Sequence, residues 1–214
     1  LPRFFKTGKG EYGEGDQFIG VVVPNLRIVA KKHFDADFDT LRELLASPYH
    51  EYRLTALLAL TYRYAKLKDH TSRETCVNFY VSQVDAINNW DLVDLSCYKI
   101  LGHWLFDKDK QLLYDWAKEN HLWKQRIAII SCMHFVKQGE FKDALAIADL
   151  LQHHPHDLIH KAVGWILREI GKEDEQLLVD YLTPRYKEMP RTMLRYAIER
   201  FEEGKRKAFL NSTI

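Results

Sequence analysis

The sequence predicts an all-α fold, arranged as a curved solenoid of paired helices, on three observations. After residue 20, apolar residues recur at spacings of three and four, as at Leu41, Leu44 and Leu45, which is the period of a helix with one buried face. Six prolines and ten glycines are few for an all-β fold with many turns. The third observation is that the expected helices form pairs that look alike along the chain.

The apolar spacing, together with polar breaks such as SPYH and HHPH, places the expected helices in order. Proline and small polar residues favour turns, so we read each break as the end of a helix. The expected helices lie near 24–34, 37–46, 50–67, 72–86, 90–105, 109–119, 122–137, 141–153, 157–171, 174–188 and 190–202. The glycine-rich stretch GKGEYGEGD at 8–16 is the one clear loop, and we expect it to be ordered against the first helix pair.

The second helices of successive pairs resemble one another in sequence. They read EYRLTALLAL, LVDLSCYKIL, KQRIAIISCM, IHKAVGWILR and MLRYAIERF. Anchors in these helices are 41, 32, 35 and 34 residues apart, and the anchors are Arg53, Asp94, Arg126, Lys161 and Arg195. HEAT and armadillo repeats have periods of about 40–47 residues, and other helix-pair repeats lie near 34. Since one pair cannot bury its apolar face alone, we expect the pairs to stack into a C-shaped solenoid with a concave groove.

Composition and charge narrow the class of protein without identifying a partner. The chain has 214 residues, enough for one domain, and a net charge of only +1, which neither favours nor excludes nucleic acid. Three widely spaced cysteines without a CxxC motif argue against a disulfide framework and a zinc finger. No apolar run is long enough for a membrane span, and the N-terminus has no apolar signal core. We therefore expect one cytoplasmic domain spanning 1–214.

Four of the five anchor residues are basic, and Asp94 is the lone acid among them. If the second helices line the concave side, the basic anchors form a cationic row along one groove; they are Arg53, Arg126, Lys161 and Arg195. Such a row suits the phosphates of a nucleic acid. A solvated helix face with local ion pairs explains the same pattern, and the residues alone leave both readings open.

The stretch INNWDLVDLS at 87–96 contains the candidate site residues of the first half of the chain. Asp91 follows two asparagines that can cap a helix, so we interpret it as part of the helix start. Asp94 lies beyond the first turn and shares a helix face with Trp90, four residues before it. An ion pair with a neighbouring helix would also explain Asp94, and core packing would also explain Trp90.

Trp165 is the corresponding aromatic candidate in the second half. It lies four residues after Lys161 and shares its face, and Gly164 beside it permits a close approach by another helix or by a ligand. Ordinary core packing is again the alternative for the tryptophan.

The sequence gives little support for a metal site or for other catalytic motifs. His156 and His160 are one helical turn apart, as zinc ligands can be, but neither an HExxH motif nor a third ligand is marked by spacing. Pro155 and Asp157 at a helix start fit capping better. GxSxG is missing, as is a GxGxxG motif after a strand. We predict no metal and no cofactor.

Five sequence blocks carry a resemblance to a known family. They are FFKTGKGEYGEGD, INNWDLVD, LWKQRIAII, HDLIHKAVGWILREIG and MPRTMLRYAIE, in this order. Together they resemble the AlkD-like DNA alkylation repair family, whose members are DNA glycosylases built from HEAT-like repeats. The resemblance extends from about residue 3 to about residue 202.

The resemblance implies an enzyme that hydrolyses the N-glycosidic bond of positively charged alkylated purines in duplex DNA, such as 3-methyladenine and 7-methylguanine, without a base-flipping pocket. It implies that Asp94 stabilises the sugar cation and that Trp90 and Trp165 flank the deoxyribose, and we expect the chain to be a monomer. It also implies a phosphate contact for Arg126, to which the cationic row adds Lys161, Arg53 and Arg195. The alternative is a non-catalytic HEAT-like scaffold that binds DNA or a protein.

Overall fold

Every regular element of the described part of the chain is a helix. The computed structural model describes residues 2–214, and outside its helices this range holds one isolated parallel bridge, between Gln17 and Tyr49. The predicted all-α class is therefore confirmed, and the helix pairs are those of an α-solenoid. The chain divides into two compact units, Leu1–Trp104 (unit 1) and Leu105–Ile214 (unit 2). A single domain, the C-shape and the concave groove stay predictions.

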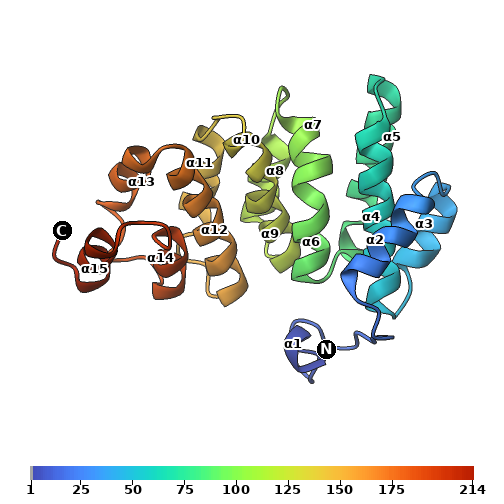
Figure 1. Cartoon of the computed structure of the whole chain (residues 1–214), viewed down its shortest axis with the longest axis horizontal. Coiled ribbons are helices and arrows are strands. Elements are labelled where there is room, and N and C mark those ends of the chain that lie inside the picture. The colour runs from blue at the N-terminus through green and yellow to red at the C-terminus, as the bar shows by residue number, and fades with distance from the viewer. Residues whose placement is uncertain (1) are drawn as a thin grey trace. The chain divides into compact units, whose positions relative to one another are not determined.

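Unit 1 is built around its longest helix, α4. In chain order its elements are α1 (Pro2–Phe5), α2 (Val23–Lys32), α3 (Phe38–Leu45), α4 (His50–Lys66), α5 (His70–Ser82), the 3-10 turn η1 (Val84–Ala86), α6 (Trp90–Cys97) and the π-helical turn η2 (Tyr98–Gly102). Helices α2 and α3 both pack on α4, and α4 also packs on α6 (Figure 1). The N-terminus of α3 is capped by Asp37, and that of α5 by Asp69, each through a bond from a backbone N–H three residues on.

Unit 2 repeats the pairing that the sequence predicts. The short helix α7 (His103–Leu105) leads into it, and the elements that follow are α8 (Gln111–Lys118), α9 (Leu122–Ser131), α10 (Met133–Val136), α11 (Lys142–Leu151), α12 (Asp157–Glu173), α13 (Glu175–Leu182), α14 (Arg191–Ala197) and α15 (Glu203–Asn211). Helix α8 packs on α9 and α11 on α12, while α12 also packs on α13 and α14 (Figure 1). No helix within residues 2–214 has both the length and the apolarity to cross a bilayer.

The structure departs from the expected helices at several points. The helix expected over 90–105 contains the π turn η2, and the one expected over 174–188 ends at Leu182. Helices α1 and α15 were not predicted. Helix α15 begins where the Glu202 carboxylate accepts the N–H groups of Gly204 and Lys205. Its apolar face is short, since Phe209 is the residue that it buries, so the apolar period that marks the other helices is missing.

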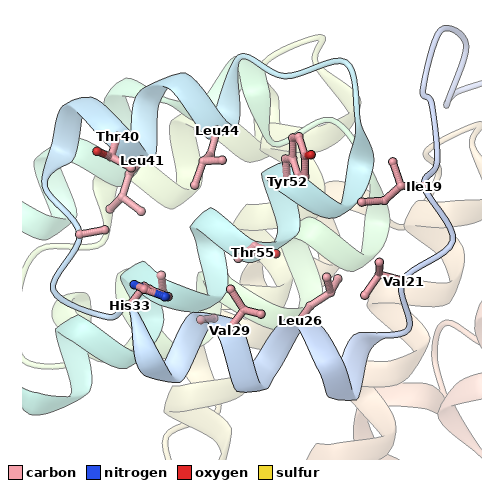
Figure 2. A pocket seen from close by; sticks show the side chains of 13 residues that line it. Ile19, Val21, Leu26, Val29, His33, Thr40, Leu41, Leu44, Tyr52 and Thr55 are labelled. Atoms are coloured by element: carbon pink, nitrogen blue, oxygen red, sulfur yellow. The ribbon is translucent and has the colours of Figure 1, made fainter.

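An apolar cavity of about 410 Å³ opens between α2, α3 and α4. Figure 2 shows Leu26 and Val29 of α2, Leu41 and Leu44 of α3 and Tyr52 of α4 around it. Aspartate and glutamate are missing from its lining. The cavity therefore lacks the carboxylate that a glycosidic hydrolysis needs, and we place no reaction in it.

Helix α14 packs closely on α12 because residue 164 is a glycine. A Cβ at Gly164 would lie 2.5 Å from the Cβ of Tyr196 and 2.6 Å from the carbonyl oxygen of Met193. The sequence left open whether a helix or a ligand approaches this glycine, and the structure places a helix there. The contact fixes the part of α12 that carries Trp165.

We expect Gly164→Ala to lower the free energy of unfolding by about 1–3 kcal/mol, the usual cost of overpacking. The added methyl meets a backbone carbonyl, which a side-chain rotation cannot move away. Chemical denaturation measures the loss.

Gly171→Ala is the matched control on the same helix. Its added Cβ would meet chiefly the terminal Cδ2 of Leu178, at 2.4 Å, and this flexible side chain can move. Alanine also favours a helix over glycine. Equal losses in the two variants would contradict the close contact at Gly164.

Candidate functional site

The start of α6 is fixed by buried polar groups. Asn89 is fully buried, and its side-chain oxygen accepts a hydrogen bond from the N–H of Trp90 at 2.8 Å. The Asp91 carboxylate accepts the N–H of Leu92 at 2.9 Å. These bonds satisfy backbone donors that a helix start leaves without partners, and they determine where the next turn, with Asp94, begins.

Trp90 lies against two phenylalanines of the N-terminal segment, which we define as residues 2–22. Its ring stacks on Phe5, with centroids 5.6 Å apart and planes 17° apart, and meets Phe4 edge to face, also at 5.6 Å. Trp90 is half-buried, whereas Phe4 is 64% exposed. Aromatic packing is thus one role of Trp90, although the ring keeps an exposed part.

Asp94 is half-buried one turn beyond Trp90, among aromatic side chains. Burial and the nearby Cys97 and Asp94 raise the pKa of the Tyr80 phenol well above its usual value. Burial chiefly raises the pKa of Tyr98 too; Cys97 and Asp94 add to this rise and Arg27 of α2 opposes it. The charge of Asp94 therefore acts on the phenols of Tyr80 and Tyr98. The charge of Arg27, from α2, also acts on Tyr98.

Asp91 has a structural role, but with a partner that the sequence did not indicate. It is buried, and its carboxylate is 2.8 Å from Nε2 of His50, the first residue of α4. The other ring nitrogen of His50 is 3.2 Å from the Asp16 carboxylate, which also accepts from Asn89 at 3.1 Å. The interpretation of Asp91 as part of the helix start is therefore confirmed, and the structure adds that Asp91 is one side of a buried ion pair.

Arg53 is not placed as a phosphate ligand. Its side chain is inside unit 1, only 5% of the residue is exposed, and the guanidinium binds the Asp16 carboxylate and the Ser47 carbonyl. A buried, paired guanidinium cannot reach a phosphate without breaking these bonds. We therefore correct the expectation for Arg53 and assign it to the buried ion cluster, which consists of Asp16, His50, Arg53 and Asp91.

The predicted loop at 8–16 is ordered, as are the residues after it. The Glu51 carboxylate of α4 accepts the N–H groups of Ile19 at 3.1 Å and Gly20 at 2.8 Å. A Cβ at Gly13 would lie 2.4 Å from the Phe5 carbonyl oxygen, so this glycine lets the loop fold back on α1. The N-terminal segment is thereby attached to both α4 and α6.

In unit 2, Arg126 and Lys161 lie around the start of α12. Arg126 of α9 is 4% exposed and donates to the Leu158 carbonyl, while Lys161 pairs with Asp157 at 2.6 Å. Burial lowers the pKa of His156, and the charges of Arg126 and Lys161 lower it further while Asp157 opposes them. The structure thus brings Arg126 and Lys161 together at the start of α12, where Asp157 offsets part of their positive charge.

Trp165 and Arg195 complete the candidate residues of unit 2. Trp165 is half-buried on α12, one turn after Lys161, and Arg195 is exposed on α14, which packs on α12. Of the four predicted basic residues, Arg53 and Arg126 are buried and Lys161 and Arg195 reach solvent. The four basic residues of the predicted row therefore do not all lie on a solvent-exposed helix face.

The histidine-rich turn serves helix α12. His156 is its N-cap and accepts the N–H of Leu158 at 3.1 Å, and His154 bonds to Gln125 at 3.0 Å. Within the described residues, no group of three or more His, Cys, Asp or Glu side chains is arranged to hold a metal ion. The predicted helix start is confirmed for Asp157, which lies in the first turn of α12, whereas the cap itself is His156 and Pro155 precedes it.

A model of the family described as DNA alkylation repair enzyme matches residues 1–201. The chain belongs to this family. Its fold is similar to that of a solved structure described as a predicted DNA alkylation repair enzyme from Enterococcus faecalis, with a TM-score of 0.69 and 13% sequence identity, over 94% of this chain and 96% of that one. A comparison with curated proteins found no match. Membership of the DNA alkylation repair family supports a role in the repair of alkylation damage.

Sequence reasoning missed the residues that hold this family member's α6 in place. His50 and Asp16 lie far from Asp91 in the sequence, and no periodic pattern links them. The sequence held one hint: α4, a largely buried helix, begins with two polar residues, His50 and Glu51, which are buried as well. Arg27, whose charge reaches Tyr98, was likewise not singled out.

The ion cluster predicts a loss of stability in mild alkali. Burial alone would lower the pKa of His50, but its hydrogen bonds to Asp16 and Asp91, and their charges, raise it to about 9 from 6.5. The stabilisation is therefore complete below about pH 6.5 and is lost as the pH rises toward 9. Chemical denaturation of the wild type between pH 6 and 10 measures this decline.

His50→Gln should remove most of the decline between about pH 6.5 and pH 8, although it lowers stability at every pH; at higher pH the raised pKa values of Cys76, Tyr80 and Tyr98 add a decline of their own. Burial lowers the pKa values of His154 and His156, which places their effects below pH 6.5. A decline of the same steepness in His50→Gln would mean that another group titrates.

Proposed function

We propose that the chain is a DNA glycosylase that excises positively charged alkylated purines, 3-methyladenine and 7-methylguanine, from duplex DNA. The observation that carries the proposal is the half-buried Asp94 carboxylate one turn beyond Trp90, on a helix whose start is rigidly held, in a chain of the DNA alkylation repair family.

The chemistry explains why one carboxylate suffices. An alkyl group on N3 or N7 gives the purine a positive charge, so the base leaves with the bonding electron pair of the C1′–N bond and needs no acid to protonate it. Positive charge then develops on the deoxyribose. Asp94 stabilises this charge as an ionised carboxylate, as carboxylates do in other glycoside hydrolyses. Water adds to C1′ and releases a proton, which leaves an abasic sugar and a neutral base.

The tryptophans are proposed to contact the sugar of the damaged nucleotide. The face of an indole ring is electron-rich and attracts a neighbouring cation. Trp90 has Phe5 stacked on its ring, which holds the indole in one orientation. Trp165 lies on α12 beside Gly164, where the close contact with α14 fixes the backbone.

Phosphate contacts are proposed for the basic residues that reach solvent. Lys161 and Arg195 are such residues on neighbouring helices of unit 2, and contacts to phosphates position a duplex without reading its sequence. Arg126 is buried against the start of α12. We propose that it contributes positive charge there from its buried position, without a direct phosphate contact, and we withdraw Arg53 from the set.

The sharpest test of the function is Asp94→Asn. The change is nearly isosteric and removes one negative charge, so transition-state stabilisation should suffer far more than binding of the ground state. We expect single-turnover release of 7-methylguanine to fall at least about a hundredfold, as for the loss of other stabilising groups. DNA affinity and the midpoint of thermal unfolding should stay near those of the wild type.

Asp35→Asn is the matched control, because Asp35 is an exposed acid in unit 1. Asp91→Asn is unsuitable as a control, because it breaks the buried ion pair with His50. If the wild type bound DNA but released no base, the chain would be a non-catalytic scaffold. If the loss in Asp94→Asn followed its unfolding, Asp94 would be a structural ion-pair partner.

Binding to duplex DNA should weaken steeply with salt. Each neutralised phosphate contributes about −0.9 to the slope of log affinity against log salt concentration. Lys161→Ala and Arg195→Ala should each make this slope shallower by about one phosphate and weaken binding equally on all sequences. Fluorescence anisotropy at several salt concentrations measures both effects.

Arg53→Ala should behave differently, because it removes a charge from the ion cluster. We expect it to lower stability and to leave the salt slope of the folded fraction unchanged. An affinity that did not respond to salt would contradict the proposed phosphate contacts.

A further inference from the structure

The ion cluster joins three segments that are distant in the sequence. Asp16 comes from the N-terminal segment, His50 and Arg53 from the first turn of α4, and Asp91 from the first turn of α6. The side chains of all four are at least nine-tenths buried. Two carboxylates face two cations when His50 is protonated, so the charges within the cluster balance.

His50 can satisfy both carboxylates only as an imidazolium. Its Nδ1 lies 3.2 Å from Asp16 and its Nε2 lies 2.8 Å from Asp91. A carboxylate is an acceptor, and a neutral imidazole has one N–H donor, whereas the imidazolium has two. Loss of the proton would leave one buried carboxylate facing a ring lone pair and would give the cluster a net negative charge, which a low-dielectric interior disfavours.

Three contacts connect His50 to Trp90. Asp91, which bonds to His50, follows Trp90 directly in the chain. The Phe5 ring lies 4.8 Å from the His50 ring and 5.6 Å from the Trp90 ring, measured between centroids. Asn89 donates to the Asp16 carboxylate and accepts from the Trp90 N–H. The position of the indole therefore depends on the cluster through the backbone, through a ring and through a buried amide.

We propose that His50 is a positioning residue whose bonds to Asp16 and Asp91 hold the N-terminal segment against α6 and so fix Trp90 and Asp94 for reaction. When this link is broken, the segment separates from α6, the Phe5 ring leaves Trp90, and the first turn of α6 loosens. The inference deepens the proposed function and rests on it for the roles of Trp90 and Asp94.

The groups around His50 agree with this role. The charged groups that face it are Asp16, Asp91 and, through Asp16, Arg53, while Glu51 on the same helix binds the backbone at Ile19 and Gly20. Phe5 and Phe18 lie against the imidazole, with Phe18 at 5.1 Å between centroids, and keep water from it. The raised pKa of His50, about 9, keeps the link intact at neutral pH.

Hydrogen exchange tests the link without relying on catalysis. We expect His50→Gln to speed the exchange of amides in residues 10–20 and 89–94 at least tenfold, with amides of α12 as the internal reference. The matched control is His33→Gln, because His33 is an exposed histidine of unit 1, and it should leave both segments protected. Wild type at pH 10 should lose the same protection relative to α12, a measurement that needs no variant to fold.

Base release supplies the second readout. His50→Gln should slow single-turnover excision about ten- to a hundredfold at pH 7, in proportion to a displaced site, and excision by the wild type should fall as the pH rises past 9. Unchanged protection in His50→Gln and in the wild type at pH 10 would overturn the inference. Loss of protection without slower excision would overturn it as well. A wild type that releases no base would refute the proposed function alone, and the exchange result would still decide whether His50 holds α6.

Discussion

The hydrogen bonds of one buried imidazolium join three segments of unit 1. His50 stands at the first residue of α4 and links Asp16 to Asp91, so the N-terminal segment, α4 and α6 meet at a single charged group. Removing one partner from such a buried set leaves an unpaired charge, which costs about 3–5 kcal/mol. The aromatic contacts of Trp90, the capped start of α6 and the place of Asp94 all depend on this arrangement.

The need to pair buried charges also decides which arginines lie in the interior. A buried carboxylate needs a partner, and Arg53 serves Asp16. Arg126 is likewise drawn into the interior, against the backbone of α12. Some basic residues therefore hold helices together, and others reach solvent. The near-neutral net charge of the chain does not show which arginines belong to which group.

The helices were predictable because their apolar faces repeat every three or four residues, and the fold class followed from that local pattern. Trp90 and Asp94 were predictable as residues on one face of α6. The link from His50 to Asp91 was not, because it joins residues of two helices through a contact that leaves no spacing in the sequence. The burial of Arg53 was missed for the same reason: a basic anchor in a repeat looks identical whether it faces solvent or a distant aspartate. Gly164 lay between these cases, since its small size signalled a close approach without naming the neighbour.

The π turn η2 begins four residues after Asp94. Because of this turn, a change in the number of residues here would alter the structure more than a substitution would. A π turn holds one more residue than an α turn needs, so the helix continues with its later side chains rotated by about 100°. Deleting one residue from Tyr98–Gly102 would turn His103 and Trp104, which pack on Tyr64 and His70 respectively, away from those partners. Substitutions here leave the rotation intact, whereas a change of one residue in length would rotate the last residues of unit 1, His103 and Trp104.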